Sequence, residues 1–272
     1  MTRARGVLVN GTLAVAATLT VVPLLWMVSA SLMPTGEATA LPPRLLPSAV
    51  TLEHYRELFT RLRLARVLAN SAGLAAAVTV VSVLLNSLAG YAFAKLQFAG
   101  RDCVFRVLLA ALVIPGQVSM LPLFLMLRNM GLINTYFGVL VPGMASIFGI
   151  FLVRQYALSI PQSLLDAARV DGAGELRIYW SLVVPFCKPV LVTLAVFTFM
   201  GSWNDFLWPL IVLTDEDLQT LPVALANLLG EHVQDVELMM AGAVLTVLPV
   251  VVMFLSLQRY YLEGIVSGGV KE

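Results

Sequence analysis

Charged residues are scarce in this sequence, and their scarcity excludes an ordinary water-soluble domain. Asp, Glu, Lys and Arg make up 12% of its 272 residues, about half of the roughly 25% that is usual in soluble domains. Hydrophobic residues account for 59%, and the mean hydropathy is +0.89. The composition therefore predicts an integral membrane protein.

Features of nucleic-acid-binding proteins, disulfide-bonded proteins and metalloenzymes are also missing. The formal net charge is +1, and no basic run carries interleaved aromatic residues, so no nucleic-acid partner is expected. The two cysteines, Cys103 and Cys187, both fall on the side predicted to be cytoplasmic, where disulfides are rare. His54 and His232 lie far apart without metal-ligand spacing. We expect no metal site and no cofactor on this chain, and an intramembrane enzyme is disfavoured.

A nucleotide-binding loop is missing as well. Such a loop, GxxxxGKS or GxxxxGKT, requires a Gly-Lys pair, but the three lysines follow Ala94, Cys187 and Val270. The chain is therefore expected not to hydrolyse ATP by itself.

Long apolar runs are present, and they predict an all-α membrane protein with six transmembrane helices. About 20 apolar residues cross the hydrocarbon core, and backbone groups in lipid must be satisfied within the segment. The first run exceeds the core of a secretion signal, so it is expected to be an uncleaved span. We treat 1–272 as one transmembrane domain, with spans at 9–33, 68–93, 106–127, 136–157, 187–213 and 239–260.

The distribution of basic residues predicts that both termini are cytoplasmic. In that orientation most Lys and Arg lie inside, and the outer loop at 215–237 contains acids but no Lys or Arg. Several arginines between spans one and two, such as Arg56 and Arg63, run against the rule.

The outer segment 34–66 contains apolar residues at helical spacing. An amphipathic helix lying on the outer surface and a connecting helix packed on the bundle both fit this pattern. The residues that define it are Tyr55, Leu58, Phe59, Leu62 and Ala65.

Small and amide residues interrupt two of the spans. Asn86, Ser87 and Gly90 in span two favour close helix packing and hydrogen bonds between helices. In span three, Pro115-Gly116-Gln117 predicts a kink or an opened helix. Such a break either borders a transport pathway or is purely structural.

The stretch SIPQSLLDAARVDGAGELRIYWSLVVP, on the side predicted to be cytoplasmic, contains a segment that is too polar to enter lipid. Ser159 followed by Gln162 fits a capping box, and Gly172 favours the left-handed conformation that ends a helix. A second short helix is expected after Gly174, leading into span five at Pro185. The segment 160–172 is therefore predicted to be a cytoplasmic helix between spans four and five.

This predicted helix has an apolar side and a charged side. Leu164, Leu165 and Ala168 share one side, whereas Asp166 and Arg169 present charge beside them. The small alanines would let another protein approach the helix closely, as in a helix-in-groove contact. Packing of the helix on its own bundle is the alternative.

The same stretch resembles a known motif. The pattern D-A-A-x-x-D-G-A, followed by Ile178 and Pro185, resembles the EAA loop of membrane subunits of binding-protein-dependent ATP-binding-cassette (ABC) importers. Asp166 stands where that family usually has Glu, and Val184 stands where it usually has Leu. Four further stretches resemble the sugar-importer branch, specifically its MalG-like permease subunit: LAGYAFAKLQFAGRD, MGLINTYFGVLVP, GSWNDFLWPLIVL and QRYYLEGIVSGGVKE.

The resemblance implies a partner complex in a prokaryotic cell (inner) membrane. It includes a second permease subunit, a cytoplasmic ATPase dimer that carries ATP and Mg, and an extracytoplasmic binding protein that delivers a sugar. The predicted helix would act as a coupling helix that contacts the ATPase, and the C-terminal tail, if it is not disordered, would reach into the ATPase dimer. By position the coupling residues are Asp166, Ala167, Ala168, Arg169, Asp171 and Gly172, and the tail residues are Gly268, Gly269, Val270 and Lys271.

Candidates for the substrate path are fewer and less specific. Trp203, Asn204, Asp205 and Trp208 combine aromatic, amide and carboxylate groups, which is the chemistry that holds sugars; they could equally anchor the helix at the outer interface and meet the binding protein. Glycerol phosphate or polyol transport is the alternative within the class. Because Asp205 is the only acid in a predicted span, ion-coupled transport is disfavoured. Further candidates are Asn86, Ser87 and Gln117.

Overall fold

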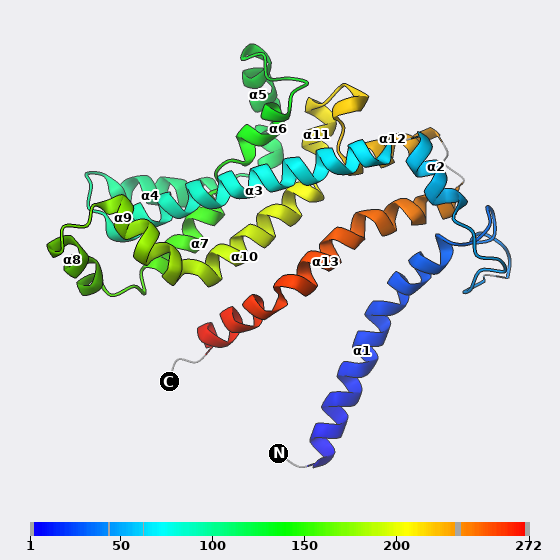
Figure 1. Ribbon diagram of the computed structural model, residues 1–272, viewed down its shortest axis with the longest axis horizontal. Coiled ribbons are helices and arrows are strands. Elements are labelled where there is room, and N and C mark those ends of the chain that lie inside the picture. The colour runs from blue at the N-terminus through cyan, green and yellow to red at the C-terminus, as the bar shows by residue number, and fades with distance from the viewer. Residues whose placement is uncertain (1–2, 43, 62, 232–234, 270–272) are drawn as a thin grey trace. The chain divides into compact units, whose positions relative to one another are not determined.

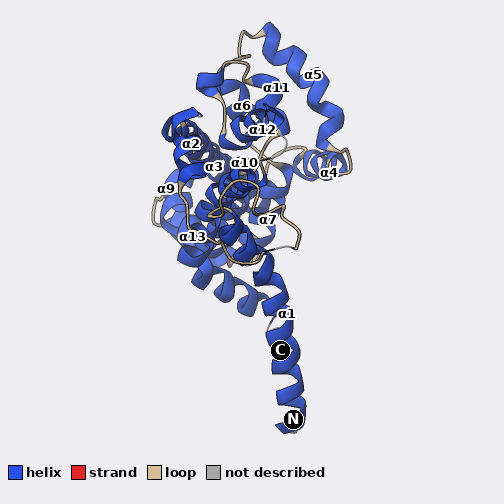
Figure 2. Cartoon of the chain, turned by 90° about the vertical axis from the view of Figure 1, so that its right-hand side faces the viewer, coloured by secondary structure: helices blue, strands red, loops and turns tan. Residues whose placement is uncertain are grey.

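The computed structural model describes residues 3–42, 44–61, 63–231 and 235–269. Within these residues every regular element is a helix and no strand occurs (Figure 2). The predicted all-α class is confirmed. The chain forms two compact units, one made of Met1–Val67 and Leu221–Pro249 and the other of Leu68–Thr220 and Val250–Glu272.

Several of the helices have the length and composition of membrane spans. Within the described residues, four qualify as continuous helices: Gly6–Ala30, Leu64–Lys95, Glu175–Trp203 and Val236–Ser256. Two bent pairs raise the number to six if each pair is one span. These pairs are Arg101–Ala111 with Gly116–Asn129, bent by 105°, and Tyr136–Gly143 with Ile147–Ala157, bent by 40°.

The first unit contains the N-terminal helix and the connecting segment 34–66. His54 and Leu58 of the connecting helix are buried, and the Tyr55 hydroxyl hydrogen-bonds the Ser31 hydroxyl at 2.8 Å. These contacts therefore favour a connecting helix packed on its neighbours over an amphipathic helix lying on the outer surface. The helices of this unit are α1 (Arg3–Ala30), α2 (Glu53–Arg61), α12 (Leu221–Glu231) and the first part of α13 (Val236–Gly269).

The second unit contains the other helices (Figure 1). Its α-helices are α3 (Leu64–Lys95, mostly in this unit), α4 (Arg101–Ala111), α5 (Gly116–Asn129), α6 (Tyr136–Gly143), α7 (Ile147–Ala157), α8 (Gln162–Val170), α9 (Glu175–Ile178), α10 (Val184–Trp203) and α11 (Leu207–Val212). A π-helical turn at Tyr179–Val183 joins α9 to α10, and a 3-10 turn lies at Glu216–Leu218. Pro185 has no N–H to donate to the preceding turn, which favours the wider turn at this point.

Small residues bring α3 close to α7, as the sequence predicts. A Cβ added to Gly90 would lie 2.7 Å from the Val153 Cβ, and one added to Gly149 would lie 2.6 Å from the Asn86 Nδ2. Asn86 accepts a hydrogen bond from the Ser146 N–H at 2.9 Å. This amide therefore satisfies backbone at the break between α6 and α7, where Ser146 also caps α7.

Three of the predicted spans are interrupted. Span 106–127 breaks at residues 112–115, and Pro115, where the sequence predicts a kink, directly precedes α5. Span 136–157 breaks at residues 144–146, which the sequence analysis did not anticipate. Span 187–213 is divided because α10 ends at Trp203 and α11 begins only at Leu207.

Candidate functional site

The end of α8 confirms the conformation predicted for Gly172. This glycine has φ +82°, its N–H donates to the Arg169 carbonyl at 3.0 Å, and the Ala173 N–H donates to the Ala168 carbonyl at 2.9 Å. These two bonds form a Schellman motif, which satisfies the last carbonyls of a helix and requires a left-handed residue. The direction of the chain leaving α8 is therefore fixed by this one residue.

The start of α8 differs from the prediction. The Ser159 hydroxyl donates to the Tyr156 carbonyl at 2.7 Å, and Gln162 donates to Asp166 at 3.2 Å, so the capping box is wrong. Ser159 belongs to the turn that continues α7, because its N–H also bonds the Tyr156 carbonyl. Pro161, which precedes α8, lacks an N–H and so reduces the need for a cap.

The apolar side of α8 packs on the chain itself. Leu165 is fully buried, and Leu164 and Ala168 pack against the same core, which includes Tyr91 and Tyr179. The opposite side presents Ser163, Ala167 and Val170 at i, i+4 and i+7, and Val170 is 87% exposed. One side of α8 therefore packs on its own chain. The other side is exposed, carries mostly small side chains and could contact another protein.

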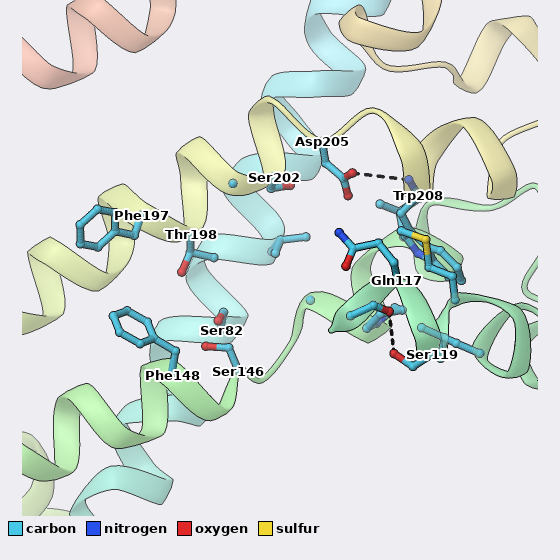
Figure 3. Close-up of a pocket in the computed structure, with 18 of the residues that line it drawn as sticks. Ser82, Gln117, Ser119, Ser146, Phe148, Phe197, Thr198, Ser202, Asp205 and Trp208 are labelled. Carbon is cyan, nitrogen blue, oxygen red and sulfur yellow. Dashed lines mark hydrogen bonds between the residues drawn. The ribbon is translucent and has the colours of Figure 1, made fainter. Parts of the chain in front are cut away.

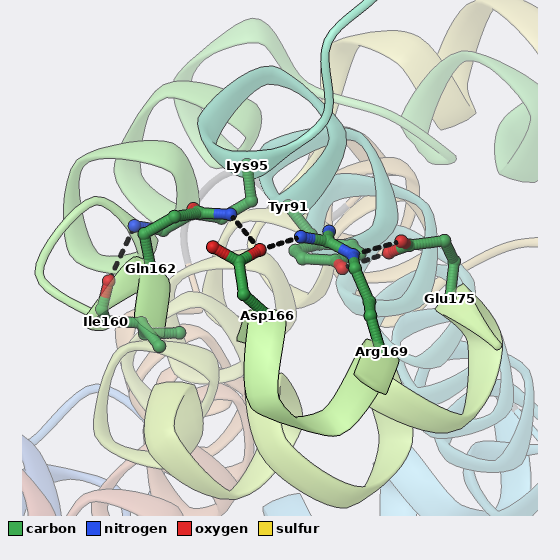
Figure 4. Close-up of polar contacts among 7 residues, drawn as sticks. All are labelled: Tyr91, Lys95, Ile160, Gln162, Asp166, Arg169 and Glu175. Carbon is green, nitrogen blue, oxygen red and sulfur yellow. Dashed lines mark hydrogen bonds and ion pairs between the residues drawn. The ribbon is translucent and has the colours of Figure 1, made fainter. Parts of the chain in front are cut away.

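Charged residues beside α8 are paired within the segment. Arg169 lies between two carboxylates (Figure 4); its Nη1 donates to Asp166 at 2.7 Å and its Nε donates to Glu175 at 2.8 Å. The hydrogen bond to Glu175 raises the pKa of Arg169, so the guanidinium stays charged. Asp171 and Gly172 are exposed at the end of the helix.

Of the tail residues, Gly268 and Gly269 are the last residues of α13. Val270 and Lys271 lie outside the described residues.

A cavity of about 620 Å³ lies at the other end of the second unit. Of the substrate-path candidates, Gln117, Asp205 and Trp208 line it, and Figure 3 shows Gln117 and Asp205 directed into the same space. The Asp205 carboxylate accepts a hydrogen bond from the Trp208 N–H at 3.4 Å. Because Gly116 and Gln117 are both in the wall, the helix break at Pro115 borders this cavity.

Four other candidates do not line the cavity. Asn86 and Ser87 are buried in helix contacts, the latter through a 2.6 Å hydrogen bond to the Tyr179 hydroxyl. Trp203 is buried and stacks on Phe199. Asn204 is exposed and donates to the Met200 carbonyl.

Sequence reasoning missed several residues of the cavity wall. Thr198 is four residues before Ser202, and Ser202 is three residues before Asp205. This helical spacing places the polar residues on one side of an otherwise apolar segment, which is a recognisable pattern. Ser82 lies four residues before Asn86 on α3. The others, which no pattern marked, are Ser119, Ser146, Phe148 and Phe197.

Within the described residues, no group of three or more His, Cys, Asp or Glu is placed to hold a metal ion.

Comparison with known proteins identifies the family. Arabinooligosaccharides transport system permease protein AraQ of Halalkalibacterium halodurans is 38% identical over 94% of this chain and 92% of its own length. Lactose transport system permease protein LacG of Rhizobium radiobacter is 32% identical over 95% of this chain and 94% of its own. A chain in the crystal structure of a bacterial ABC transporter involved in the import of the acidic polysaccharide alginate superposes with a TM-score of 0.83 and 26% identity, covering 96% of this chain and 99% of that one.

Residues 82–265 match the family described as binding-protein-dependent transport system inner membrane component. The segment includes both α8 and the cavity wall from Ser82 to Trp208. The resemblance inferred from the D-A-A motif is confirmed. The chain therefore belongs to the family of inner-membrane permease components of binding-protein-dependent ABC transporters.

Proposed function

We propose that this chain is the permease subunit of an ABC importer that forms part of the translocation pathway for a mono- or oligosaccharide. The names of AraQ and LacG, which refer to arabinooligosaccharides and lactose, support a sugar substrate. The observation that carries the proposal is the exposed, small-residue side of α8, held on a buried core and ended by the left-handed Gly172.

The arrangement in the membrane is part of the proposal. Each bent helix pair counts as one span, which gives six spans within the transmembrane domain, with both termini and α8 on the cytoplasmic side. The chain would then lie in a prokaryotic cell (inner) membrane. The four continuous helices and the two bent pairs support the number of spans, and the distribution of basic residues supports the orientation.

Three kinds of protein partner complete the proposed importer. A cytoplasmic ATPase dimer would receive the exposed side of α8 and the tail after Gly268, and it would carry ATP and Mg, since this sequence has no Gly-Lys pair for a phosphate-binding loop. A second permease subunit would supply the other side of the pathway. An extracytoplasmic binding protein would deliver the sugar.

The lining of the cavity favours a neutral sugar over an anionic solute such as glycerol phosphate. Among the described residues of the wall, Asp205 is the only ionisable side chain, and its negative charge would repel a phosphate or a sugar acid. Hydroxyl groups, an amide and aromatic rings also line the wall, so it offers both hydrogen bonds and stacking surfaces. The hydroxyl groups are those of Ser82, Ser119, Ser146, Thr198 and Ser202, and the rings are those of Phe148, Phe197 and Trp208.

Crosslinking tests the contact with the ATPase. The exposed Cys103 is first replaced by Ser, while the buried Cys187 is kept. Ala167→Cys and Val170→Cys should then crosslink to the ATPase, whereas Leu165→Cys, at a buried position, should not. Crosslinks confined to this chain, or labelling of Ala167→Cys by an impermeant thiol reagent from outside the cell, would contradict the proposal.

A transport assay tests the activity itself. The complete complex, reconstituted in proteoliposomes, should take up a neutral sugar only when ATP and the binding protein are present. The purified permease alone should hydrolyse no ATP, and ATP-independent uptake driven by an ion gradient would overturn the assignment.

A further inference from the structure

Tyr91, a residue outside the D-A-A motif, is hydrogen-bonded to the segment that contains α8. Its hydroxyl, on α3, donates to the Glu175 Oε2 at 2.5 Å. The Glu175 Oε1 accepts from Arg169 at 2.8 Å, and Arg169 in turn donates to Asp166 at 2.7 Å. Figure 4 shows Asp166, Arg169 and Glu175 in a row, with Tyr91 beside Arg169. We call the chain from Tyr91 through Glu175 and Arg169 to Asp166 the polar relay.

A second attachment lies one helical turn further along α3. The Lys95 Nζ donates to the Ile160 carbonyl at 2.6 Å and to the Leu158 carbonyl at 3.2 Å. These carbonyls precede α8, whereas Glu175 follows it. Because Tyr91 and Lys95 are four residues apart, they share one side of α3. That side therefore holds the α8 segment at both of its ends.

The buried end of the polar relay carries most of its strength. Asp166, Arg169 and Glu175 are all partly exposed, and exposed ion pairs contribute little because water screens them. Tyr91 is only 3% exposed, and its bond is made to a charged acceptor, which is the stronger kind of hydrogen bond. Removal of the Tyr91 hydroxyl should therefore weaken the attachment of α8 more than the loss of one surface ion pair would.

The same helix reaches the cavity. Val78 and Ser82 of α3 line the cavity wall, and Ser82 lies nine residues before Tyr91, about 13 Å at the rise of an α-helix. A displacement of the α8 segment would therefore be transmitted along a single continuous helix to the cavity.

We propose that Tyr91 and Glu175 are positioning residues for energy coupling. They fasten α8 to α3, so that movement of α8 imposed by the ATPase displaces the cavity wall. This inference rests on the proposed function. In this scheme Asp166 is held by Arg169 within the chain, and its contribution to coupling is made through the relay.

The test uses the complete complex in proteoliposomes, with sugar uptake and ATP hydrolysis measured on the same vesicles. Tyr91→Phe keeps the ring and removes the donor, and Glu175→Gln keeps the shape and removes the charge. Each should lower the number of sugar molecules taken up per ATP hydrolysed about tenfold, the lower end of the range expected for weakening or losing one charge-assisted hydrogen bond. Hydrolysis stimulated by the binding protein should persist.

Two further variants separate coupling from folding. Tyr156→Phe is the matched control, because Tyr156 packs against the same core and its hydroxyl makes no hydrogen bond in the described part of the chain. It should leave the uptake ratio unchanged. The double variant Tyr91→Phe with Glu175→Gln should lose less than the sum of the two single variants, because both substitutions act on the same Tyr91–Glu175 bond.

The outcomes distinguish the relay from the proposed function. A wild-type ratio in Tyr91→Phe, or a proportional fall of uptake and hydrolysis together with a lower melting temperature, would overturn the relay alone. If the unmodified complex takes up no sugar in response to ATP, the proposed function fails and the relay fails with it.

Discussion

The two ends of the second unit are built in different ways. At the end that carries α8, polar side chains are paired with one another, and the chain runs without a break in helical structure from Glu175 to Trp203. At the end that carries the cavity, helices break at Pro115, at residues 144–146 and after Trp203. There the Gln117 and Asp205 side chains face open space.

The difference suits two mechanical tasks. A segment that receives a push must keep its shape, and paired charges over a buried core provide stiffness. A surface that a solute passes must offer hydrogen-bonding groups, and broken helices bring backbone and side-chain groups to such a surface. In the proposed importer, the chain would thus combine a rigid transmitter with an adaptable wall.

The largest effect is predicted for a substitution of Gly172, which ends α8. Gly172→Val forces a β-branched residue into the left-handed region at a cost of about 1–2 kcal/mol, although no atom lies within 4 Å of the added Cβ. Uptake by the complex should fall about tenfold while the protein still inserts in the membrane. Gly172→Asn is the matched control, since Asn tolerates this conformation. Wild-type uptake by Gly172→Val would argue against a fixed exit from α8.

A smaller effect is predicted at the adaptable end. Asp205→Asn removes the one ionisable group of the described cavity wall and should raise the KM for sugar uptake about fivefold, as expected for one weakened hydrogen bond of about 1 kcal/mol. Uptake per ATP hydrolysed should not change, which separates this end from the α8 end. Asn204→Ala, at an exposed position outside the wall, should leave KM unaltered. A changed coupling ratio in Asp205→Asn would show that the two ends are not separable.

The smallest effect is predicted where the capping box was expected. Ser159→Ala should change the thermal stability of the complex by no more than about 0.5 kcal/mol, because the hydroxyl bonds only the Tyr156 carbonyl. A loss of stability typical of a removed helix cap, about 1 kcal/mol or more, would instead support Ser159 as the N-cap of α8.

The comparison also explains what the sequence could reveal. Gly172 and Pro115 were predictable because each acts through its own backbone: one tolerates a positive φ and the other lacks an N–H. The hydrogen bond between Tyr91 and Glu175 joins residues 84 positions apart, and no local pattern encodes it. The break at residues 144–146 was missed because hydropathy stays high across it, and Ser159 was misassigned because a turn ending one helix looks like a cap beginning the next.

The 105° bend between α4 and α5 has a consequence for the surroundings of the chain. Where a helix opens at membrane depth, its first amides have no partner within the helix, and acyl chains offer them none. Such backbone persists only beside protein or water. If the bend lies within the bilayer, lipid tails are shut out from residues 112–116, so this edge of the subunit must face either a neighbouring chain or a hydrated channel.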